Sequence, residues 1–312
     1  MFRFLPGPIA GILILILGCG LTTLIFVFLI LPFAIAKLTI PHAGWRLWCT
    51  RQLVKATTLW AHAVTFSLNQ GRQPQWDLQG LEGFSPQGKY LLLSNHSTWM
   101  DIPVLLRVFP GHLPFPRPFI KQQLLWLPII GFSAWAIDCP FMRRYTKEEL
   151  EKHPEWRGRD LETTRRSCEK FRQLPVTVLN YVEGTRFTEA KRVARQSPYR
   201  NLLRPKSAGA AFVLNAMGDQ FDAIINMTIA YTPGVDTSFW NCICGGMPEI
   251  TMRVEKFPVP AEFVHGNYQE DPVFQKNFQA WMTNLWDRKQ KLIDELHAQM
   301  GAQPTASTRS AA

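Results

Sequence analysis

Residues 90–101 read YLLLSNHSTWMD, and this stretch decides the fold class that we predict for the 312-residue chain. Residues 90–94 form a short apolar run that ends in a polar residue, which is typical of a buried strand. A helix is expected over residues 101–109, with Asp101 as its N-cap and Pro103 in its first turn, where proline is tolerated. The polar residues between the two elements therefore form a strand-to-helix turn.

The alternation of strands and helices continues along the chain. Further strands are expected at residues 119–120, 176–182, 222–231 and 249–257, and further helices at residues 160–173, 207–217 and 272–299. Residues 71–88 are polar and indicate a connector or a pair of surface strands. Strands that alternate with helices indicate an α/β core. We therefore predict an α/β domain over residues 71–299 and a disordered tail over residues 300–312.

The N-terminal segment is strongly apolar. No charged side chain occurs from Pro8 to Ala36, and this run exceeds the roughly 20 residues that a bilayer crossing requires. A signal peptide is the alternative, but its apolar core has only about 7–15 residues. Residues 1–40 are predicted to be a membrane anchor that either crosses the bilayer once or turns back at Gly18, Gly20 or Pro32.

Residues 41–70 follow the anchor with tryptophan and basic side chains in an amphipathic pattern. The pattern predicts a helix, which either lies at the membrane interface or packs on the protein core. The basic residues Lys37, Arg46, Arg51 and Lys55 cluster on this side of the anchor. Positively charged flanks stay in the cytoplasm, so the rest of the chain is expected on the cytoplasmic side.

Another apolar segment lies at residues 123–137, within the predicted α/β domain. Pro128 and Gly131 interrupt it, so it cannot form a continuous membrane-spanning helix. We expect it to form a lipid-facing or acyl-binding surface.

The overall charge and the cysteines narrow the possible partners. A formal charge of +10 indicates an anionic partner, such as nucleic acid, an anionic lipid surface or a phosphorylated substrate. No nucleic-acid-binding motif occurs, and the anchor argues against nucleic acid.

The six cysteines include no Cys-x-x-Cys pair, so neither a metal site nor a cofactor is expected. Cys242 and Cys244 are two residues apart, as in a small redox or metal pair, or are ordinary buried cysteines.

His96 and Asp101 are candidates for a catalytic pair. In an extended chain they would lie roughly 16 Å apart, but a strand-to-helix turn can fold the carboxylate back onto the imidazole. Asp101 would then fix the tautomer of His96 and leave its other ring nitrogen free to remove a proton. The alternative is a surface histidine beside a helix cap.

A second group of polar residues follows the strand predicted at residues 176–182. Glu183, Gly184, Thr185 and Arg186 form an abrupt turn there, where α/β folds bind their ligands. Glycine allows a close approach of the backbone, and arginine can hold a phosphate with two hydrogen bonds. A capped turn with an ordinary surface ion pair is the alternative.

Taken together, these motifs resemble those of the lysophosphatidate acyltransferase family, also called the glycerophospholipid acyltransferases. The family has a His-x4-Asp block, matched by His96 and Asp101, and a Glu-Gly-Thr-Arg block, matched by residues 183–186. Its intermediate block matches Lys121, before Leu-x-x-x-Pro-x-x-Gly, and Arg144, which closes a Phe-x-x-Arg element. The resemblance implies a mixed sheet flanked by helices. It also implies that Lys121, Arg144 and residues 183–186 bind the substrate.

The resemblance further implies the reaction. A fatty acyl group would pass from acyl-CoA or acyl carrier protein to the free hydroxyl of a lysophospholipid, first of all 1-acylglycerol-3-phosphate, giving phosphatidate. His96 would act as general base, Asp101 would orient it, and backbone donors near Gly184 would stabilise the oxyanion. The expected location is the cell inner membrane, with the catalytic domain in the cytoplasm and the lipid bilayer as a partner.

Three alternatives remain open at this point. The acceptor could be lysophosphatidylglycerol or lysocardiolipin, the enzyme could be a transacylase with a phospholipid donor, or the protein could bind membrane lipids without turnover. One departure from the family bears on the acceptor and acyl pocket. Asn226 stands in a hydrophobic strand where the family usually carries a proline.

Overall fold

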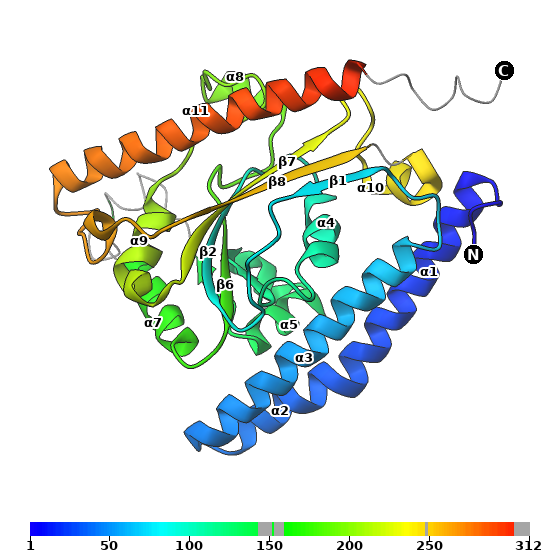
Figure 1. Ribbon diagram of the computed structural model, residues 1–312. Helices are drawn as coiled ribbons and strands as arrows, with labels where there is room; N and C mark the ends of the chain where they lie inside the picture. The colour runs from blue at the N-terminus through cyan, green and yellow to red at the C-terminus, as the bar shows by residue number, and fades with distance from the viewer. Residues whose placement is uncertain (143–151, 153–158, 247–248, 303–312) are drawn as a thin grey trace.

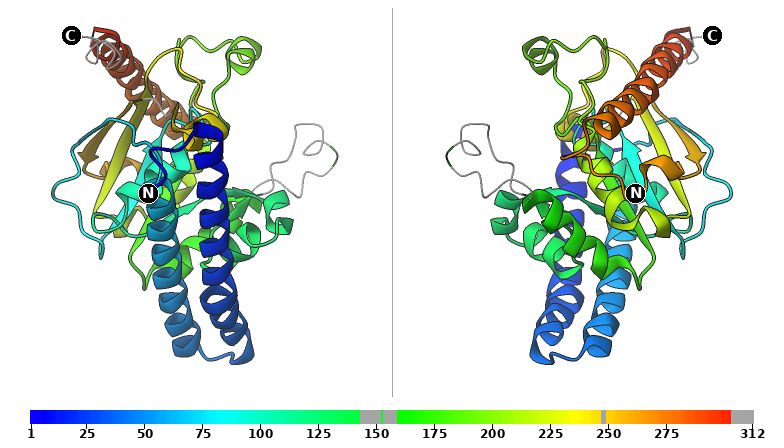
Figure 2. Two further views of the ribbon diagram at one scale, coloured as in Figure 1. Left: turned by 90° about the vertical axis from the view of Figure 1, so that its right-hand side faces the viewer. Right: turned by 90° about the vertical axis from the view of Figure 1, so that its left-hand side faces the viewer.

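The computed structural model describes residues 1–142, 152, 159–246 and 249–302. A central sheet is covered by helices on both faces, and a long pair of N-terminal helices lies along one side of the molecule (Figure 1). The far end of this helical pair projects beyond the rest of the protein in both side views (Figure 2). The predicted α/β class with flanking helices is therefore confirmed.

The sheet is mixed. Its strand order is β1-β8-β7-β2-β6-β3. The strands β7, β2, β6 and β3 are parallel to one another, β8 is antiparallel to β7, and β1 is parallel to β8. The bounds of these strands are Trp76–Gln79 (β1), Lys89–Ser94 (β2), Pro116–Pro118 (β3), Val176–Tyr181 (β6), Ala223–Tyr231 (β7) and Ile250–Phe257 (β8). A separate parallel pair joins β4 (Ile120–Lys121) to β5 (Phe141–Met142).

Helices cover both faces of the sheet because the parallel strands are apolar on both sides. Leu91 and Leu93 of β2 face the core formed with α7, α9 and α11, whereas Leu92 faces α4. Each fully buried leucine contributes roughly 1.5–3 kcal/mol to folding. The helices of the domain are α4 (Asp101–Val108), α5 (Ile130–Ala136), α7 (Arg159–Phe171), α8 (Glu189–Ala194), α9 (Ala208–Met217), α10 (Phe239–Asn241) and α11 (Pro272–Ala302).

The N-terminal helices form a hairpin. α1 (Gly7–Ile25), a π-helical turn (Phe26–Ile30) and α2 (Leu31–Thr39) make one continuous helix, and α3 (Ala43–Leu68) returns along it. Pro32 lacks a backbone N–H, and the wide turn just before it absorbs the missing bond without a break. Of the two alternatives left open for the anchor, a reversal at Gly18, Gly20 or Pro32 does not occur, because the chain reverses only at residues 40–42.

Most predicted elements of the domain are present, with small shifts at their ends. The polar segment at residues 71–88 contributes one strand, β1, and not a pair. Residues 123–137 are divided as expected, into a 3₁₀ turn (Gln122–Trp126) and α5. α11 runs to Ala302, so the tail predicted from residue 300 does not begin there. Residues 303–312 lie outside the described part of the chain.

Candidate active site

Three parallel strands end at one edge of the sheet, and the candidate site lies there. β2 runs between β6 and β7, and its last residue, Ser94, pairs with Tyr181 on one side and Met227 on the other. The turn after β2 carries His96 and the turn after β6 carries Glu183, although the two residues are 87 positions apart in sequence. The topology therefore brings both sequence motifs to the edge where α/β folds bind ligands.

The structure places His96 and Asp101 in direct contact. Nδ1 of His96 lies 2.7 Å from Oδ2 of Asp101, and the histidine side chain is 13% exposed whereas the aspartate is fully buried. An ionised carboxylate accepts hydrogen bonds and donates none, so His96 must donate from Nδ1. Its Nε2 is then the nitrogen that can remove a proton from a substrate.

Asp101 is anchored from several directions. Its Oδ2 also accepts hydrogen bonds from the backbone N–H groups of Ser97 and Thr98, at 2.7 and 3.1 Å, and its Oδ1 accepts one from the Tyr231 hydroxyl at 2.6 Å. Asp101 is the first residue of α4, and Met100 precedes it as the N-cap. The expected N-cap role of Asp101 is therefore wrong, because its carboxylate is directed back into the turn.

Two tyrosines surround the pair. The Tyr181 ring stacks on the His96 imidazole, with centroids 4.1 Å apart and planes 19° apart. Burial, followed by the charge of Asp101, raises the pKa of both Tyr181 and Tyr231 well above the usual value. Both hydroxyls therefore stay protonated, and Tyr231 can only donate to the carboxylate.

Glu183 supports the backbone of the site. Its side chain is fully buried. Oε1 accepts from the N–H of His96 at 3.1 Å, and Oε2 accepts from the N–H of Leu203 at 2.8 Å. Burial raises the pKa of Glu183 to about 7. Both carboxylate oxygens thus bind the backbone of the site, and the predicted contact of this residue with the substrate stays a prediction.

Gly184 and Thr185 shape the turn after β6. Gly184 has φ +70°, a conformation that glycine adopts without strain. Its N–H donates to the carbonyl of Tyr181 at 2.8 Å, so the expected oxyanion donor at Gly184 is already engaged. Thr185 Oγ1 accepts a hydrogen bond from Lys191 at 3.0 Å.

Arg186 lies beside the catalytic turn. Its guanidinium carbon is 4.4 Å from the centre of the Trp99 ring, which is a cation–π contact. Lys191 of α8 donates to the Arg186 carbonyl at 2.9 Å. Because Trp99 belongs to the turn that carries His96, this contact holds the planar guanidinium against that turn.

Basic side chains gather around Arg186. The pKa of Lys191 is lowered, first by burial and then by the positive charges of Arg186, Arg195 and Lys121. Arg186, Arg195 and Lys121 of β4 therefore all lie near Lys191, so residues of the two sequence blocks contribute to one basic cluster. Arg144, the third basic residue predicted to bind the substrate, lies outside the described residues.

The apolar segment that follows Lys121 is exposed. Trp126 is 83% exposed, and Leu124, Leu127 and Ile130 are also exposed. Gly131 permits this compact turn, because a Cβ there would lie 2.2 Å from the Leu124 carbonyl oxygen. This surface begins only a few residues from the basic cluster.

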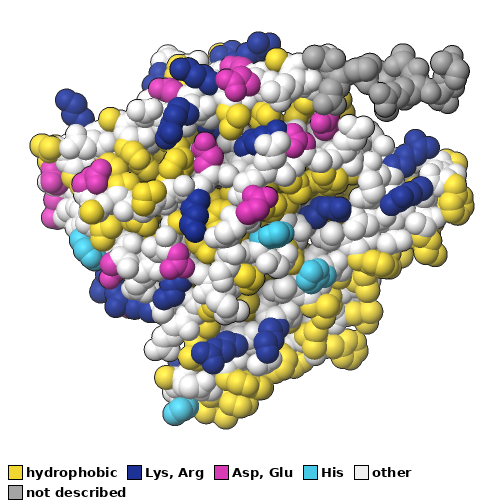
Figure 3. Space-filling view, in the orientation of Figure 1, with side chains coloured by type: hydrophobic (Ala, Val, Ile, Leu, Met, Phe, Trp, Pro, Cys, Tyr) yellow, Lys and Arg dark blue, Asp and Glu magenta, His cyan; other side chains and the backbone are white. Residues whose placement is uncertain are grey.

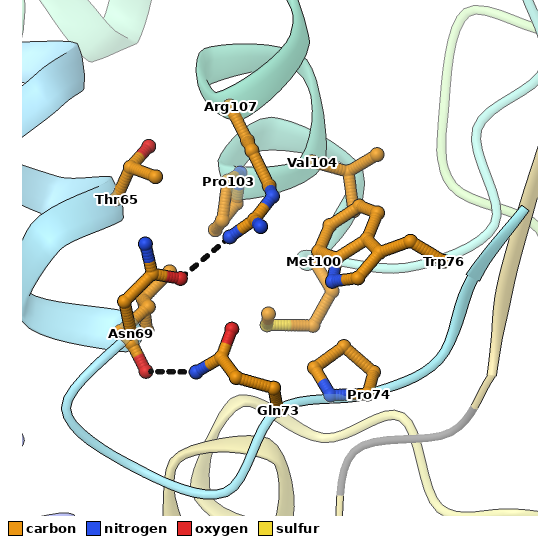
Figure 4. Close-up of a pocket in the computed structure, with 10 residues that line it drawn as sticks. Thr65, Asn69, Gln73, Pro74, Trp76, Met100, Pro103, Val104 and Arg107 are labelled. Atoms are coloured by element: carbon orange, nitrogen blue, oxygen red, sulfur yellow. Dashed lines mark hydrogen bonds between the residues drawn. The ribbon is translucent and has the colours of Figure 1, made fainter. Parts of the chain in front are cut away.

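The described residues also enclose a small hollow between α3, β1 and α4 (Figure 4). Arg107 points into it, donates to Asn69 Oδ1 at 2.5 Å and lies 4.6 Å from the centre of the Trp76 ring. Met100 of the catalytic turn forms part of its wall. His96 and the basic cluster do not line this hollow, so it is not part of the candidate active site.

No group of three His, Cys, Asp or Glu side chains in the described part of the chain is placed to hold a metal ion. Cys242 and Cys244 are both unpaired thiols.

Sequence reasoning missed four residues of the site. Tyr181 and Tyr231 end the strands predicted at residues 176–182 and 222–231, and that position is itself a signal for the site edge. Trp99 lies inside the His96–Asp101 motif. Lys191 carries no local signal, because it looks like one of many surface lysines.

The chain matches the Acyltransferase family over residues 75–231, which is half of the 312-residue chain. It is 23% identical over 230 residues to lysocardiolipin acyltransferase 1 of Danio rerio, covering 69% of this chain and 54% of that protein. It is 24% identical over 204 residues to 1-acyl-sn-glycerol-3-phosphate acyltransferase gamma of Homo sapiens, covering 62% and 49%. It is 30% identical over 163 residues to 1-acyl-sn-glycerol-3-phosphate acyltransferase 2 of Brassica oleracea, covering 48% and 39%. The chain thus spans about half the length of the first curated relatives that it matches.

The fold is also that of a solved structure. The crystal structure of the 1-acyl-sn-glycerophosphate acyltransferase PlsC from Thermotoga maritima matches with a TM-score of 0.51 over 93% of this chain and 98% of that chain, at 14% identity. The family match covers the strands β1, β2, β3, β6 and β7, and therefore both motifs of the site. The chain belongs to the Acyltransferase family, of the PlsC and 1-acylglycerol-3-phosphate acyltransferase type.

Proposed function

We propose that the protein is a 1-acylglycerol-3-phosphate O-acyltransferase that uses a fatty acyl thioester as donor. The observation that carries the proposal is the His96–Asp101 contact beside a cluster of basic side chains at one sheet edge. A base that activates a hydroxyl and an anion site for a phosphate are the two parts that acyl transfer to this acceptor requires. The names of the relatives from Homo sapiens and Brassica oleracea agree with this acceptor.

The reaction needs one proton to be moved twice. Nε2 of His96 takes the proton of the acceptor hydroxyl while that oxygen forms a bond to the thioester carbon. Buried Asp101 stabilises the resulting imidazolium. The tetrahedral intermediate then expels the thiolate, which receives the proton from His96. The acceptor supplies the attacking oxygen, so no serine or cysteine nucleophile is needed.

The phosphate of the acceptor is assigned to the basic cluster. Arg186 offers a planar guanidinium that suits two phosphate oxygens, and Lys121 adds a point charge. Lys191 and Arg195 raise the local positive potential. Charge-assisted hydrogen bonds of this kind contribute roughly 1.5–3 kcal/mol each. The acyl chain of the acceptor is assigned to the exposed apolar segment after Lys121.

The bilayer as partner is supported by the N-terminal hairpin. Residues Gly7–Thr39 form a single helix that is long and apolar enough to cross a membrane. Hydrophobic side chains gather on the lower right of the molecule, over this hairpin (Figure 3). The exposed apolar residues of the helix include Ile9, Ile12, Ile16, Leu24, Phe28, Ile35 and Leu38.

The return helix α3 constrains how the hairpin meets the membrane. The N–H of Phe2 donates to the carbonyl of Gln70 at 2.8 Å, so both ends of the hairpin lie together. If the hairpin crossed the bilayer, the exposed side chains of Arg46, Arg51 and Lys55 would enter the membrane with it. Each charge at the bilayer centre costs roughly 2.5–3.5 kcal/mol of free energy. The proposed arrangement therefore places the hairpin in the membrane interface, with the apolar side of α1 and α2 toward the acyl chains. Placement at the inner membrane with a cytoplasmic domain stays a prediction.

A second acceptor has one observation in its favour. The relative from Danio rerio is named for lysocardiolipin, which also presents phosphate and a free hydroxyl. The proposed chemistry would be the same, and only the fit of the headgroup would differ.

The test is an acyl-transfer assay with the purified full chain in mixed micelles. Lysophosphatidate, lysophosphatidylglycerol, lysocardiolipin and a monoacylglycerol are offered in turn, each with acyl-CoA and with acyl carrier protein as donor. We expect the highest kcat/KM for lysophosphatidate and complete loss in His96→Ala. Transfer by His96→Ala at the wild-type rate would refute the proposed base. A preference for lysocardiolipin would change the acceptor and leave the mechanism standing.

A further inference from the structure

A lysine interrupts the apolar stripe of the C-terminal helix α11. The stripe packs on the sheet through Phe278, Met282, Leu285, Trp286, Ile293, Leu296 and Met300, all of them buried. Lys289 lies between Trp286 and Ile293 in this stripe and is only 1% exposed. An amphipathic helix normally carries an apolar side chain at such a position, so the charge needs an explanation.

The Lys289 ammonium group is bound to the middle of β7. Nζ donates to the Met227 carbonyl at 2.5 Å and to Thr228 Oγ1 at 3.1 Å. The pairing of β7 with β2 ends at Met227. Beyond that residue, the Asn95 side chain bonds both the N–H and the carbonyl of Ile229, at 3.0 and 2.9 Å. Lys289 therefore holds β7 where its pairing with β2 ends, and from there β7 continues to Tyr231 paired with β8 alone.

The same helix holds the loop on which Glu183 depends. Tyr199 donates to Asp287 at 2.9 Å, and the N–H of Asn201 donates to Gln290 at 2.9 Å. This loop continues to Leu203, whose N–H bonds the Glu183 carboxylate. α11 thus binds two segments that lead into the site, the middle of β7 and the loop that continues to Leu203.

Lys289 and Glu183 are both buried, and each is close enough to influence the pKa of the other. Lys289 acts on Glu183 as a positive charge and Asp101 acts on it as a negative one. Two carboxylates in turn act on Lys289, those of Glu255 and Glu183. Glu255 is exposed to water and accepts a hydrogen bond from Asn226 at 2.7 Å. Glu183 is fully buried, so it is the carboxylate that most needs a countercharge.

We propose that Lys289 is a positioning residue for acyl transfer, which supplies the countercharge to the buried Glu183 carboxylate and fixes β7 at Met227 and Thr228. Through Glu183 it holds the backbone of His96, and through β7 it holds Tyr231 and hence Asp101. This inference rests on the proposed function of the His96–Asp101 pair.

The directions of the pKa shifts agree with this role. Burial raises the pKa of Glu183 to about 7, and the charge of Lys289 opposes the rise. Burial lowers the pKa of Lys289 to about 7, and the two carboxylates oppose the fall. Both oxygens of Glu183 accept backbone N–H bonds, which suits the ionised form. A protonated carboxyl would turn an O–H toward one of these N–H groups.

The test compares Lys289→Met with Lys291→Met, an exposed lysine two residues along α11. Lys289→Met keeps the length of the side chain and removes its charge and donors. We expect kcat/KM to fall at least tenfold at pH 7. The pH below which kcat/KM falls on the acid side should rise by about one unit. The reason is that loss of a nearby positive charge raises the pKa of Glu183. Lys291→Met should match the wild type in both respects.

Stability and a site probe separate this role from a general folding role. Removing Lys289 leaves the buried Glu183 carboxylate without its countercharge, which costs stability, so thermal unfolding of each variant is measured first and activities are compared well below its unfolding temperature. Diethylpyrocarbonate modification of His96, followed by mass spectrometry, reports the site without turnover. We expect its rate to change at least threefold in Lys289→Met and to stay unchanged in Lys291→Met. Lys289→Gln, a neutral side chain that can still donate, should show the same pH displacement.

Three outcomes would overturn the inference. They are unchanged activity in Lys289→Met, lost activity with no rise in the pH below which kcat/KM falls, and failure of both Lys289 variants to fold. Each leaves the proposed function standing if the wild type transfers acyl groups. A wild type that transfers none refutes the proposed function, and the His96 modification rates then still decide whether Lys289 positions that histidine.

Discussion

Asp101→Asn isolates the charge of the catalytic aspartate. Oδ2 of Asp101 accepts hydrogen bonds from His96 and from two backbone N–H groups, and Oδ1 accepts one from the Tyr231 hydroxyl. In the asparagine variant the amide oxygen must take the place of Oδ2, because three donors converge there. The amide NH₂ then faces Tyr231, whose hydroxyl can turn and accept. The tautomer of His96 is therefore kept, and the variant loses the negative charge beside the imidazolium.

The size of the effect follows from the distance. With Nδ1 and Oδ2 2.7 Å apart, the two charge centres are separated by roughly 4 Å, where an effective dielectric of 20 gives about 4 kcal/mol. We expect kcat with lysophosphatidate to fall about a thousandfold, with KM nearly unchanged. The assay is transfer of a labelled acyl group in mixed micelles, with thermal unfolding as the control for folding. A folded Asp101→Asn variant with a kcat within tenfold of the wild type would refute this account of Asp101.

Three further predictions concern the phosphate site, the buried glutamate and the hairpin. Arg186→Ala should lose about ten- to a hundredfold in kcat/KM for lysophosphatidate, Arg186→Lys should recover part of it, and an equal loss on monoacylglycerol would assign Arg186 a structural role. Because burial raises the folded-state pKa of Glu183 to about 7, the folded protein binds this proton more tightly than the unfolded chain, so stability should decline as the pH rises from about 4.5 to about 7. In denaturant titrations, the free energy of unfolding of Glu183→Gln should depend less on pH over this range. An unchanged dependence would contradict the assignment of this pKa to Glu183. The intact protein should resist extraction by salt and carbonate and require detergent, and release by salt alone would show that its attachment is electrostatic.

The core of the site was predictable because its signals are local. Residues 90–101 contain a strand, a turn and a helix start in sequence order, and the turn alone decides whether His96 meets Asp101. The contact between the turn that carries His96 and residues 183–186 can be predicted with one further argument. Two parallel strands that are neighbours in a sheet place the turns after them side by side.

Other parts of the site depend on contacts between residues far apart in sequence. Tyr231 reaches Asp101 across 130 positions, and only the pairing of β2 with β7 makes that contact possible. Lys191 joins the site because α8 folds back over the turn after β6. The hairpin reverses at residues 40–42 for a related reason. The π-helical turn before Pro32 keeps the helix continuous there, so a proline in the sequence is not a reliable sign of the reversal.

Departures from local rules were the most informative signals, and they were the hardest to interpret from sequence. Lys289 breaks the apolar stripe of α11, and Asn226 replaces the proline usual in the family. In the structure Asn226 binds Glu255, and Glu255 and Glu183 are the two carboxylates that act on Lys289. A buried charge lowers stability unless something compensates for it, so such residues persist where a site requires them. Both departures lie behind the edge that holds His96. Asn226 and the residues that Lys289 binds are consecutive in β7, the strand that continues to Tyr231 and its hydrogen bond with Asp101.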